Sequence, residues 1–119
     1  MKRINWNEIV ERDGLFYHID TNELVTGIVE EFNDYGQLET RVNFIDGERE
    51  GLSETFYENG QLSNRQNLKD GKLDGLYEFF HDTGQLERRE NYKDGELDGL
   101  YEKFYPVSSQ LELRTNYKN

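Results

Sequence analysis

Apolar and polar residues alternate along this chain in short stretches that return every 24 positions, counted from glycines at positions 27, 51, 75 and 99. In the block that starts at Gly75, the alternating stretches are LYEFF and QLERRENY, separated by HDTG and followed by KDGELDG. None of the blocks has the apolar spacing or the uninterrupted length of an α-helix. Each block therefore predicts two short antiparallel strands joined by glycine-containing turns.

The period is a true internal repeat, because six columns hold the same residue type in all four blocks. These columns begin at Glu30, Phe32, Gln37, Leu38, Arg41 and Asn43. The pattern predicts one repeat domain over residues 1–119, with Trp6 and Ile9 in an N-terminal cap over the first hairpin. The predicted boundaries are 1–26 for the cap and a leading hairpin, 27–50, 51–74 and 75–98 for full repeats, and 99–119 for a truncated repeat.

The turn inside each repeat is defined by the columns Asp34-Tyr35-Gly36, Glu58-Asn59-Gly60 and Asp82-Thr83-Gly84. A two-residue turn would force a positive φ on Tyr35 and Thr83, which is costly for bulky or β-branched residues. The sequence therefore favours a three-residue loop in which the glycine adopts the left-handed conformation. Asp82 then has a structural role in the turn, because aspartate side chains bond nearby backbone amides.

The turn also fixes which side chains share a face of the sheet. In the favoured register Phe80 lies opposite Leu86 and Tyr92 points the same way, so that apolar residues form one continuous stripe across the repeats. In the alternative register Glu78 lies opposite Arg89, and the repeats carry a ladder of ion pairs. Turn sterics and hydrophobic segregation favour the first register, and the second stays open.

The pattern G-L-Y-E-x-F/Y-x-x-x-G-Q-L-x-x-x-x-N-Y-K-D-G-x-x-D-G, best seen at residues 75–99, resembles the bacterial variant of the MORN repeat. The preceding segment, residues 12–32, resembles the usual leading segment of that family, so the resemblance runs from about Arg12 to Lys118. It implies an all-β fold, an elongated antiparallel sheet of stacked hairpins forming a single layer or a shallow solenoid, without catalytic residues. Many bacterial members of the family are antitoxins or immunity proteins, and others are interaction scaffolds.

The charge balance narrows the choice of partner. The chain has 14 basic and 25 acidic residues, a net charge of −11, which disfavours binding to nucleic acid or anionic membranes and suits a partner with a basic surface. The N-terminal segment MKRINWNEIVERDGL has no apolar run behind its positive charges, so we expect no signal peptide and a cytoplasmic location. Eight tyrosines, seven phenylalanines and one tryptophan indicate a folded chain rather than a disordered acidic one.

Residues suited to catalysis or metal binding are few. There is no cysteine, and His18 and His81 lie far apart in sequence, so we expect no disulfide, no metal and no cofactor. The triplet DTG at Asp82 matches that of aspartic proteases, but the equivalent columns read DYG and ENG, which are turns. The aspartates of KDGKLDG and KDGELDG lack the oxygen ligands and distal glutamate of an EF-hand loop, so polar turns account for them. The protein is not expected to be an enzyme.

The second face of the predicted sheet collects aromatic residues in the later repeats, flanked by acids. Large rigid rings beside charged groups are typical of protein-binding surfaces, although sheets also favour aromatics for cross-strand packing. The predicted partner-binding residues are Tyr57, Tyr77, Phe79, Tyr101 and Tyr105, with Glu31, Glu87 and Glu112 giving charge complementarity.

These observations predict a protein-binding immunity protein or antitoxin. It would cover the active site of a cognate toxin of the basic, nucleic-acid-directed class. The alternative is a general scaffold or self-assembling interaction protein without a toxin partner. Exposed sheet edges allow either a monomer or an edge-paired dimer.

Overall fold

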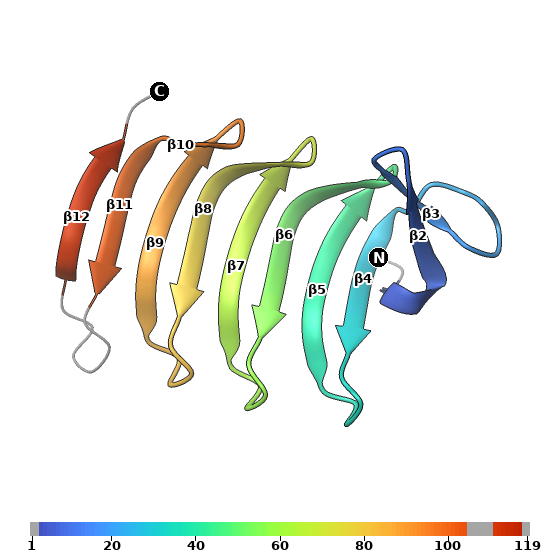
Figure 1. Cartoon of the computed structure of the whole chain (residues 1–119), viewed down its shortest axis with the longest axis horizontal. Helices are drawn as coiled ribbons and strands as arrows, with labels where there is room; N and C mark the ends of the chain where they lie inside the picture. The colour runs from blue at the N-terminus through green and yellow to red at the C-terminus, as the bar shows by residue number, and fades with distance from the viewer. Residues whose placement is uncertain (1–2, 105–110, 118–119) are drawn as a thin grey trace.

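The computed structural model describes residues 3–104 and 111–117, and it consists almost entirely of β-strands (Figure 1). The elements are β1 (Arg3–Asn5), a 3-10 helix η1 (Trp6–Glu8), β2 (Ile9–Arg12), β3 (Leu15–His18), β4 (Gly27–Phe32), β5 (Leu38–Ile45), β6 (Glu48–Phe56), β7 (Leu62–Lys69), β8 (Lys72–Phe80), β9 (Leu86–Lys93), β10 (Glu96–Leu97), β11 (Gly99–Phe104) and β12 (Leu111–Tyr117).

Ten strands form one open sheet in the order β1-β4-β5-β6-β7-β8-β9-β11-β12, with the short β10 attached to β9. The pairs are antiparallel except β1 and β4, and β2 and β3 form a separate hairpin at the N-terminal end (Figure 1). The radius of gyration is 16.1 Å, against about 13.5 Å for a compact domain of this length. The predicted fold, an elongated antiparallel sheet of stacked hairpins, is confirmed.

Two kinds of turn connect the strands, one at each end of the hairpins. The Asp-Gly turns between repeats are two-residue loops with positive φ at both positions, 52° at Asp70 and 77° at Gly71, which suits the right-handed twist of the strands. Within repeats, Gly84 N donates to His81 O (2.9 Å), and Gly84 has a φ of 93°. The predicted three-residue loop around Asp82 and the predicted Asp-Gly turns are both confirmed.

The register combines the two alternatives that the sequence left open. Phe80 lies opposite Leu86, as the favoured register predicts, but a bulge follows at once and Glu78 lies opposite Arg89. The extra residue in the second strand is Glu87, and the pairings of the other hairpins show the same shift. An inserted residue reverses the side chains beyond it, so the predicted continuous apolar stripe is wrong: Tyr92 lies on the opposite face.

Two faces can now be defined. The ladder face carries the leucine, glutamate and phenylalanine of each first strand, for example Leu76, Glu78 and Phe80. The cap face carries the residues between them, and at the N-terminal end it is covered by η1 and the β2–β3 hairpin. The apolar residues that are fully or almost fully buried all belong to this end: Ile4, Ile9, Val25, Val29, Val42 and Phe44.

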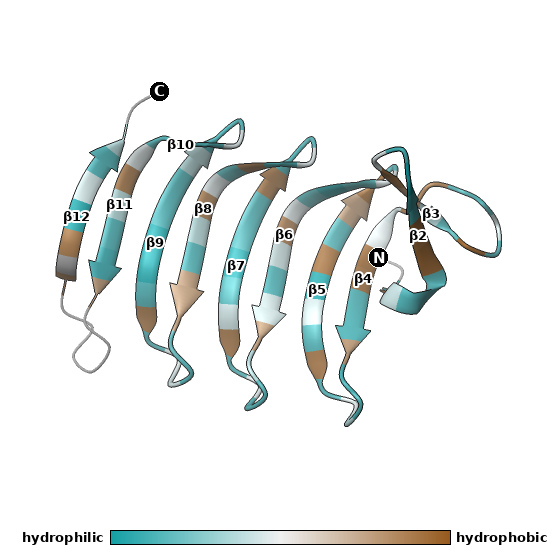
Figure 2. Ribbon diagram, viewed as in Figure 1, coloured by the Kyte–Doolittle hydropathy of each residue, from teal (hydrophilic) through white to brown (hydrophobic). Residues whose placement is uncertain are grey.

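The cap is held by aromatic packing as well as by aliphatic burial. Phe16 meets Phe44 edge to face with ring centroids 5.0 Å apart, and Trp6 lies 5.9 Å from Phe16. Figure 2 shows apolar residues in β2 and in parts of β4 and β5, whereas most of β9 is hydrophilic. The predicted covering role of Trp6 and Ile9 is confirmed, and among the described residues the hydrophobic core is confined to the cap and the first repeat.

Candidate protein-binding surface

Charge pairs on the ladder face join each repeat to the next. Nε and Nη2 of Arg65 both donate to Oε1 of Glu78, at 3.0 and 2.8 Å, and the same guanidinium lies 5.9 Å from the centroid of the Phe80 ring. Arg89 repeats the pattern one repeat later, with Glu102 and the ring of Phe104. One repeat earlier Arg41 makes a looser ion pair, with Nη1 3.6 Å from Glu54 Oε1 and the guanidinium 5.6 Å from the centroid of the Phe56 ring. Three of the invariant columns therefore serve one structural contact between repeats.

The asparagine and glycine columns form a second contact between repeats. Asn67 Nδ2 donates to Leu76 O (3.0 Å), and a Cβ added at Gly75 would lie 3.4 Å from the Cβ of Asn67. Asn91 donates to Leu100 O in the same way (2.8 Å). The glycine that starts each repeat lets the asparagine of the preceding one approach the backbone closely.

Glu102 is the most enclosed member of the ladder, with its carboxylate almost completely buried. Burial alone would raise its pKa, but hydrogen bonds from Arg89 and Arg114 outweigh that effect and hold the pKa of Glu102 below its usual value. The strands β9, β11 and β12 are thus joined by one carboxylate and two guanidinium groups.

The cap face of the third repeat carries a cluster of aromatic and charged side chains. Tyr77 stacks on Phe79 with centroids 4.3 Å apart, and Tyr92 lies 6.1 Å from Tyr77. The Arg88 guanidinium lies 4.0 Å from the centroid of the Phe79 ring, close enough for a cation–π contact. We call Tyr77, Phe79, Arg88, Glu90 and Tyr92 the aromatic patch.

Hydrogen bonding and charge pairing fix the patch. The Tyr92 hydroxyl donates to Glu90 (2.7 Å), and Nε of Arg88 lies 3.2 Å from the other carboxylate oxygen. Burial, together with the bond to Glu90 and the negative charge there, raises the pKa of Tyr92 to about 12. The hydrogen bond to Glu90 holds the ring in one orientation, which lowers the entropy cost of binding a partner.

The comparison with known families falls on these same repeats. Residues 49–70 and 73–94 each match the family model of the MORN repeat variant. No curated protein and no solved structure matches the chain.

The two MORN repeats cover most of the β6–β7 and β8–β9 hairpins, and each ends at the aspartate of an Asp-Gly turn. They mark the chain as a repeat-based scaffold of the kind used for protein interaction. In the described ranges, no helix is long and apolar enough to cross a membrane.

Among the predicted partner-binding residues, Tyr77 and Phe79 are brought together in the aromatic patch. Tyr101 lies on the same face in the next strand pair, packed edge to face against Tyr117 at 6.0 Å. Arg88, Glu90, Tyr92 and Tyr117 were missed. The bulge places these side chains on this face. A predicted hairpin that included a bulge at the start of its second strand would have assigned them to it.

The remaining predicted residues lie apart from the patch. Tyr57 bridges two repeats, because its hydroxyl donates to Phe80 O (2.5 Å). Glu31 belongs to the first repeat, and Glu87 sits at the bulge, 3.7 Å from His81 Nδ1. Tyr105 and the side chain of Glu112 lie outside the part of the chain that the structure describes.

The positions suggestive of catalysis have local structural roles. Asp82 lies at the hairpin tip, and its carbonyl accepts a hydrogen bond from Asn59 Nδ2 (2.7 Å) in the preceding repeat. Within residues 3–104 and 111–117, no group of three or more histidine, aspartate or glutamate residues is placed to hold a metal ion.

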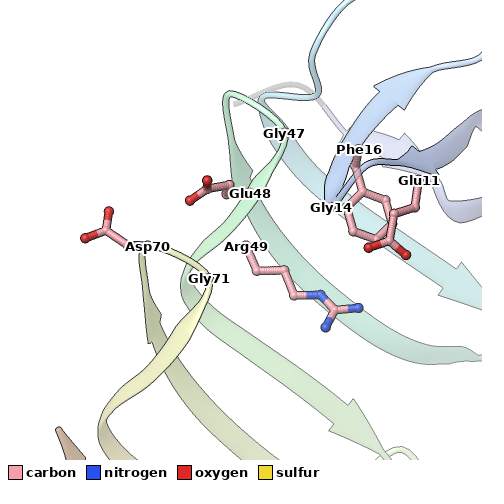
Figure 3. Close-up of a pocket in the computed structure, with 8 residues that line it drawn as sticks. All are labelled: Glu11, Gly14, Phe16, Gly47, Glu48, Arg49, Asp70 and Gly71. Atoms are coloured by element: carbon pink, nitrogen blue, oxygen red, sulfur yellow. The ribbon is translucent and has the colours of Figure 1, made fainter. Parts of the chain in front are cut away.

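A cleft also opens between the cap hairpin and the Asp-Gly turns of the first two repeats (Figure 3). Arg49 crosses it and lies 5.7 Å from the ring of Phe16, while the carboxylates of Glu48 and Asp70 point away from that of Glu11 (Figure 3). No two of these carboxylates point toward each other in the cleft. The cleft therefore lies between the cap and the repeats without the paired acids that acid–base catalysis needs.

Proposed function

We propose that this protein is an immunity protein or antitoxin that binds a toxin domain through the aromatic patch and covers its active site. The observation that carries the proposal is the patch itself. It occupies the face that the cap buries at the first repeat, but at the third repeat no described segment covers it. Rigid aromatic rings beside an arginine are the side chains that contribute most to binding energy at protein interfaces.

Charge favours a basic partner. The chain carries a net charge of −11, which steers it toward a positively charged surface and speeds association. Grooves that hold nucleic-acid phosphates are basic, so a nucleic-acid-directed toxin in the cytoplasm is the proposed target. Inhibition would be by occlusion, with no catalytic residue, metal or cofactor in this chain.

The test uses the product of the adjacent gene, expressed with and without this protein. Under the proposal the neighbour is toxic alone, and co-expression restores growth. Tyr77→Ala should weaken the complex by 10-fold or more, whereas Leu76→Ala, next to it but on the ladder face, should leave affinity unchanged. A non-toxic neighbour and no growth protection would disprove the toxin assignment.

The second candidate is a scaffold without a toxin partner, which the outer edge of β12 favours, because no strand of the described residues pairs with it. In that case Tyr77→Ala would still weaken partner binding, but no growth phenotype would follow. Asp82→Asn tests whether the chain is an enzyme. It should leave any biological activity intact, and a loss of activity with the fold preserved would contradict the assignment.

A further inference from the structure

The two ends of the sheet are built differently. At the N-terminal end, β1 has three residues, and Arg3 Nη1 donates to Glu30 Oε2 (2.6 Å) before the chain turns into η1 and the cap. At the other end, β12 has seven residues, and its outer side carries no strand from the described ranges (Figure 1). Long uncovered edges are templates for pairing with another strand.

Inside the sheet, the second strand of each repeat carries donors that reach forward to the next repeat. Arg65 holds Glu78, and Asn67 donates to the carbonyl of Leu76 beside Gly75. The acceptor strand therefore needs a glycine, a glutamate three positions later and an aromatic residue two positions beyond that.

In the last repeat, the donors of the arginine and asparagine columns are Arg114 and Asn116. Arg114 turns back instead of forward, and its Nε and Nη2 donate to Glu102 Oε2 at 3.2 and 2.8 Å. Arg89 already holds the other oxygen of that carboxylate. The Arg114 side chain is 58% exposed, against 36% for Arg65. No following strand of the described chain offers a carbonyl to Asn116.

We propose that the outer edge of β12 binds an extended antiparallel strand of a partner protein with the pattern Gly-x-x-Glu-x-aromatic. The partner's glutamate lies opposite Arg114 and its glycine beside Asn116, as in every interior joint. The described strands that carry this pattern, β4, β6, β8 and β11, are each paired on both sides, so the proposed occupant is a strand of a partner protein rather than one of these. This proposal concerns the edge and does not depend on the proposed function.

The test uses a fluorescein-labelled peptide copying β8, KLDGLYEFF, added to the full chain. We expect saturable binding by fluorescence anisotropy, weakened at least 10-fold when the peptide carries Glu78→Lys or Gly75→Val. Hydrogen exchange should show new amide protection in Leu111–Tyr117 and none in Arg3–Asn5. The protein variant Arg114→Glu should reject the natural peptide and accept the Glu78→Lys peptide, and this exchange of preference also shows that the variant is folded.

Three results would overturn the proposal: no saturable binding, equal affinity for the natural and Glu78→Lys peptides, or protection outside β12. A concentration-dependent dimer with β12 protected in the absence of peptide would also overturn it, because the occupant would then be a second copy. If Arg114→Glu does not fold, Arg114→Ala replaces it, since Arg89 still pairs Glu102, and a 10-fold loss of peptide affinity is expected.

Discussion

Phe44 and Tyr92 occupy the same position two repeats apart, yet Phe44 is 0% exposed and Tyr92 is only half-buried. The difference lies in the cap, which covers the first repeat and leaves the third open. The ladder face is alike at both places, because Arg41 in the first repeat and Arg89 in the third each pair with a glutamate of the next repeat. A single-layer sheet can therefore continue without a core, provided that each contact between neighbouring repeats has its own ion pair, ring contact and side-chain hydrogen bond to a backbone carbonyl.

The residues at the equivalent positions follow this difference. Val29 and Val42, buried beneath the cap, correspond to Tyr77 and Glu90 in the open repeat. Aliphatic residues without polar atoms suit a closed interior, whereas rings with hydroxyls and hydrogen-bonded acids suit a surface that meets water or a partner. The comparison separates residues that stabilise the fold from those free to serve binding.

The largest expected effect tests this separation directly. Phe44→Ala should lower the free energy of unfolding by about 3–5 kcal/mol, because it leaves a cavity beneath Phe16. Tyr92→Ala should cost about 2 kcal/mol, because it removes a half-buried ring and one hydrogen bond. Urea denaturation followed by circular dichroism measures both, with Tyr35→Ala, 90% exposed, as the silent control. Equal losses at Phe44 and Tyr92 would show that the core extends into the third repeat.

The Asp-Gly turns give the next contrast. Gly47 and Gly71 have φ of 83° and 77°, so alanine costs each about 1–2 kcal/mol of backbone strain. A Cβ at Gly47 would also lie 2.7 Å from Leu24 Cδ2 and 3.0 Å from Phe16 O, while nothing lies within 4 Å at Gly71. Gly47→Ala should therefore cost about 1–3 kcal/mol more than Gly71→Ala. Thermal melts of the two variants check the order, and a reversed order would mean that the cap does not press on this turn.

Acid should open the uncapped end first. The pKa of Glu102 is lower in the folded chain than in the unfolded one, so its pairing with Arg89 and Arg114 stabilises the fold above the ordinary glutamate pKa of 4.5. That stabilisation is lost as the pH falls from about 5 through the lowered pKa. Hydrogen exchange should show loss of protection in β11 and β12 before β4 and β5. In Glu102→Gln this acid dependence should flatten, and an unchanged dependence would remove Glu102 from the explanation.

The smallest expected effect concerns the hydroxyl of Tyr92. Tyr92→Phe keeps the ring but removes the hydrogen bond to Glu90, for a loss of about 1 kcal/mol or less. An ultraviolet pH titration should lose the component that ionises near pH 12. If this component persists in the variant, another tyrosine is responsible for it.

Local chemistry made much of the fold predictable. Asp-Gly and Asp-Thr-Gly predict turns, because the φ preferences of these residue types are known from the residues alone. The repeat period then indicates where the strands lie between the turns. The apolar residues around Trp6 and Ile9 likewise indicated a cap. Such features depend on neighbours in the chain and need no knowledge of distant pairing.

Features set by the pairing of strands were harder to predict. The bulge at Glu87 has no turn residue to mark it, yet it decides that Tyr92 belongs with Tyr77 rather than with Phe80. The parallel pairing of β1 could not be anticipated either, because three residues carry no periodicity. The two patch residues on β8 were therefore predicted, and the three on β9, beyond the bulge, were not.

The joint between repeats has a consequence for how such a chain can change its length. Every joint uses the same arginine, glutamate, asparagine and glycine, so a whole block of 24 residues can be added or removed without creating a new kind of contact. Neighbouring strands lie about 4.8 Å apart, so each block moves the edge of β12 about 1 nm further from the cap. The number of repeats therefore sets the distance between the N-terminal cap and the outer edge of β12.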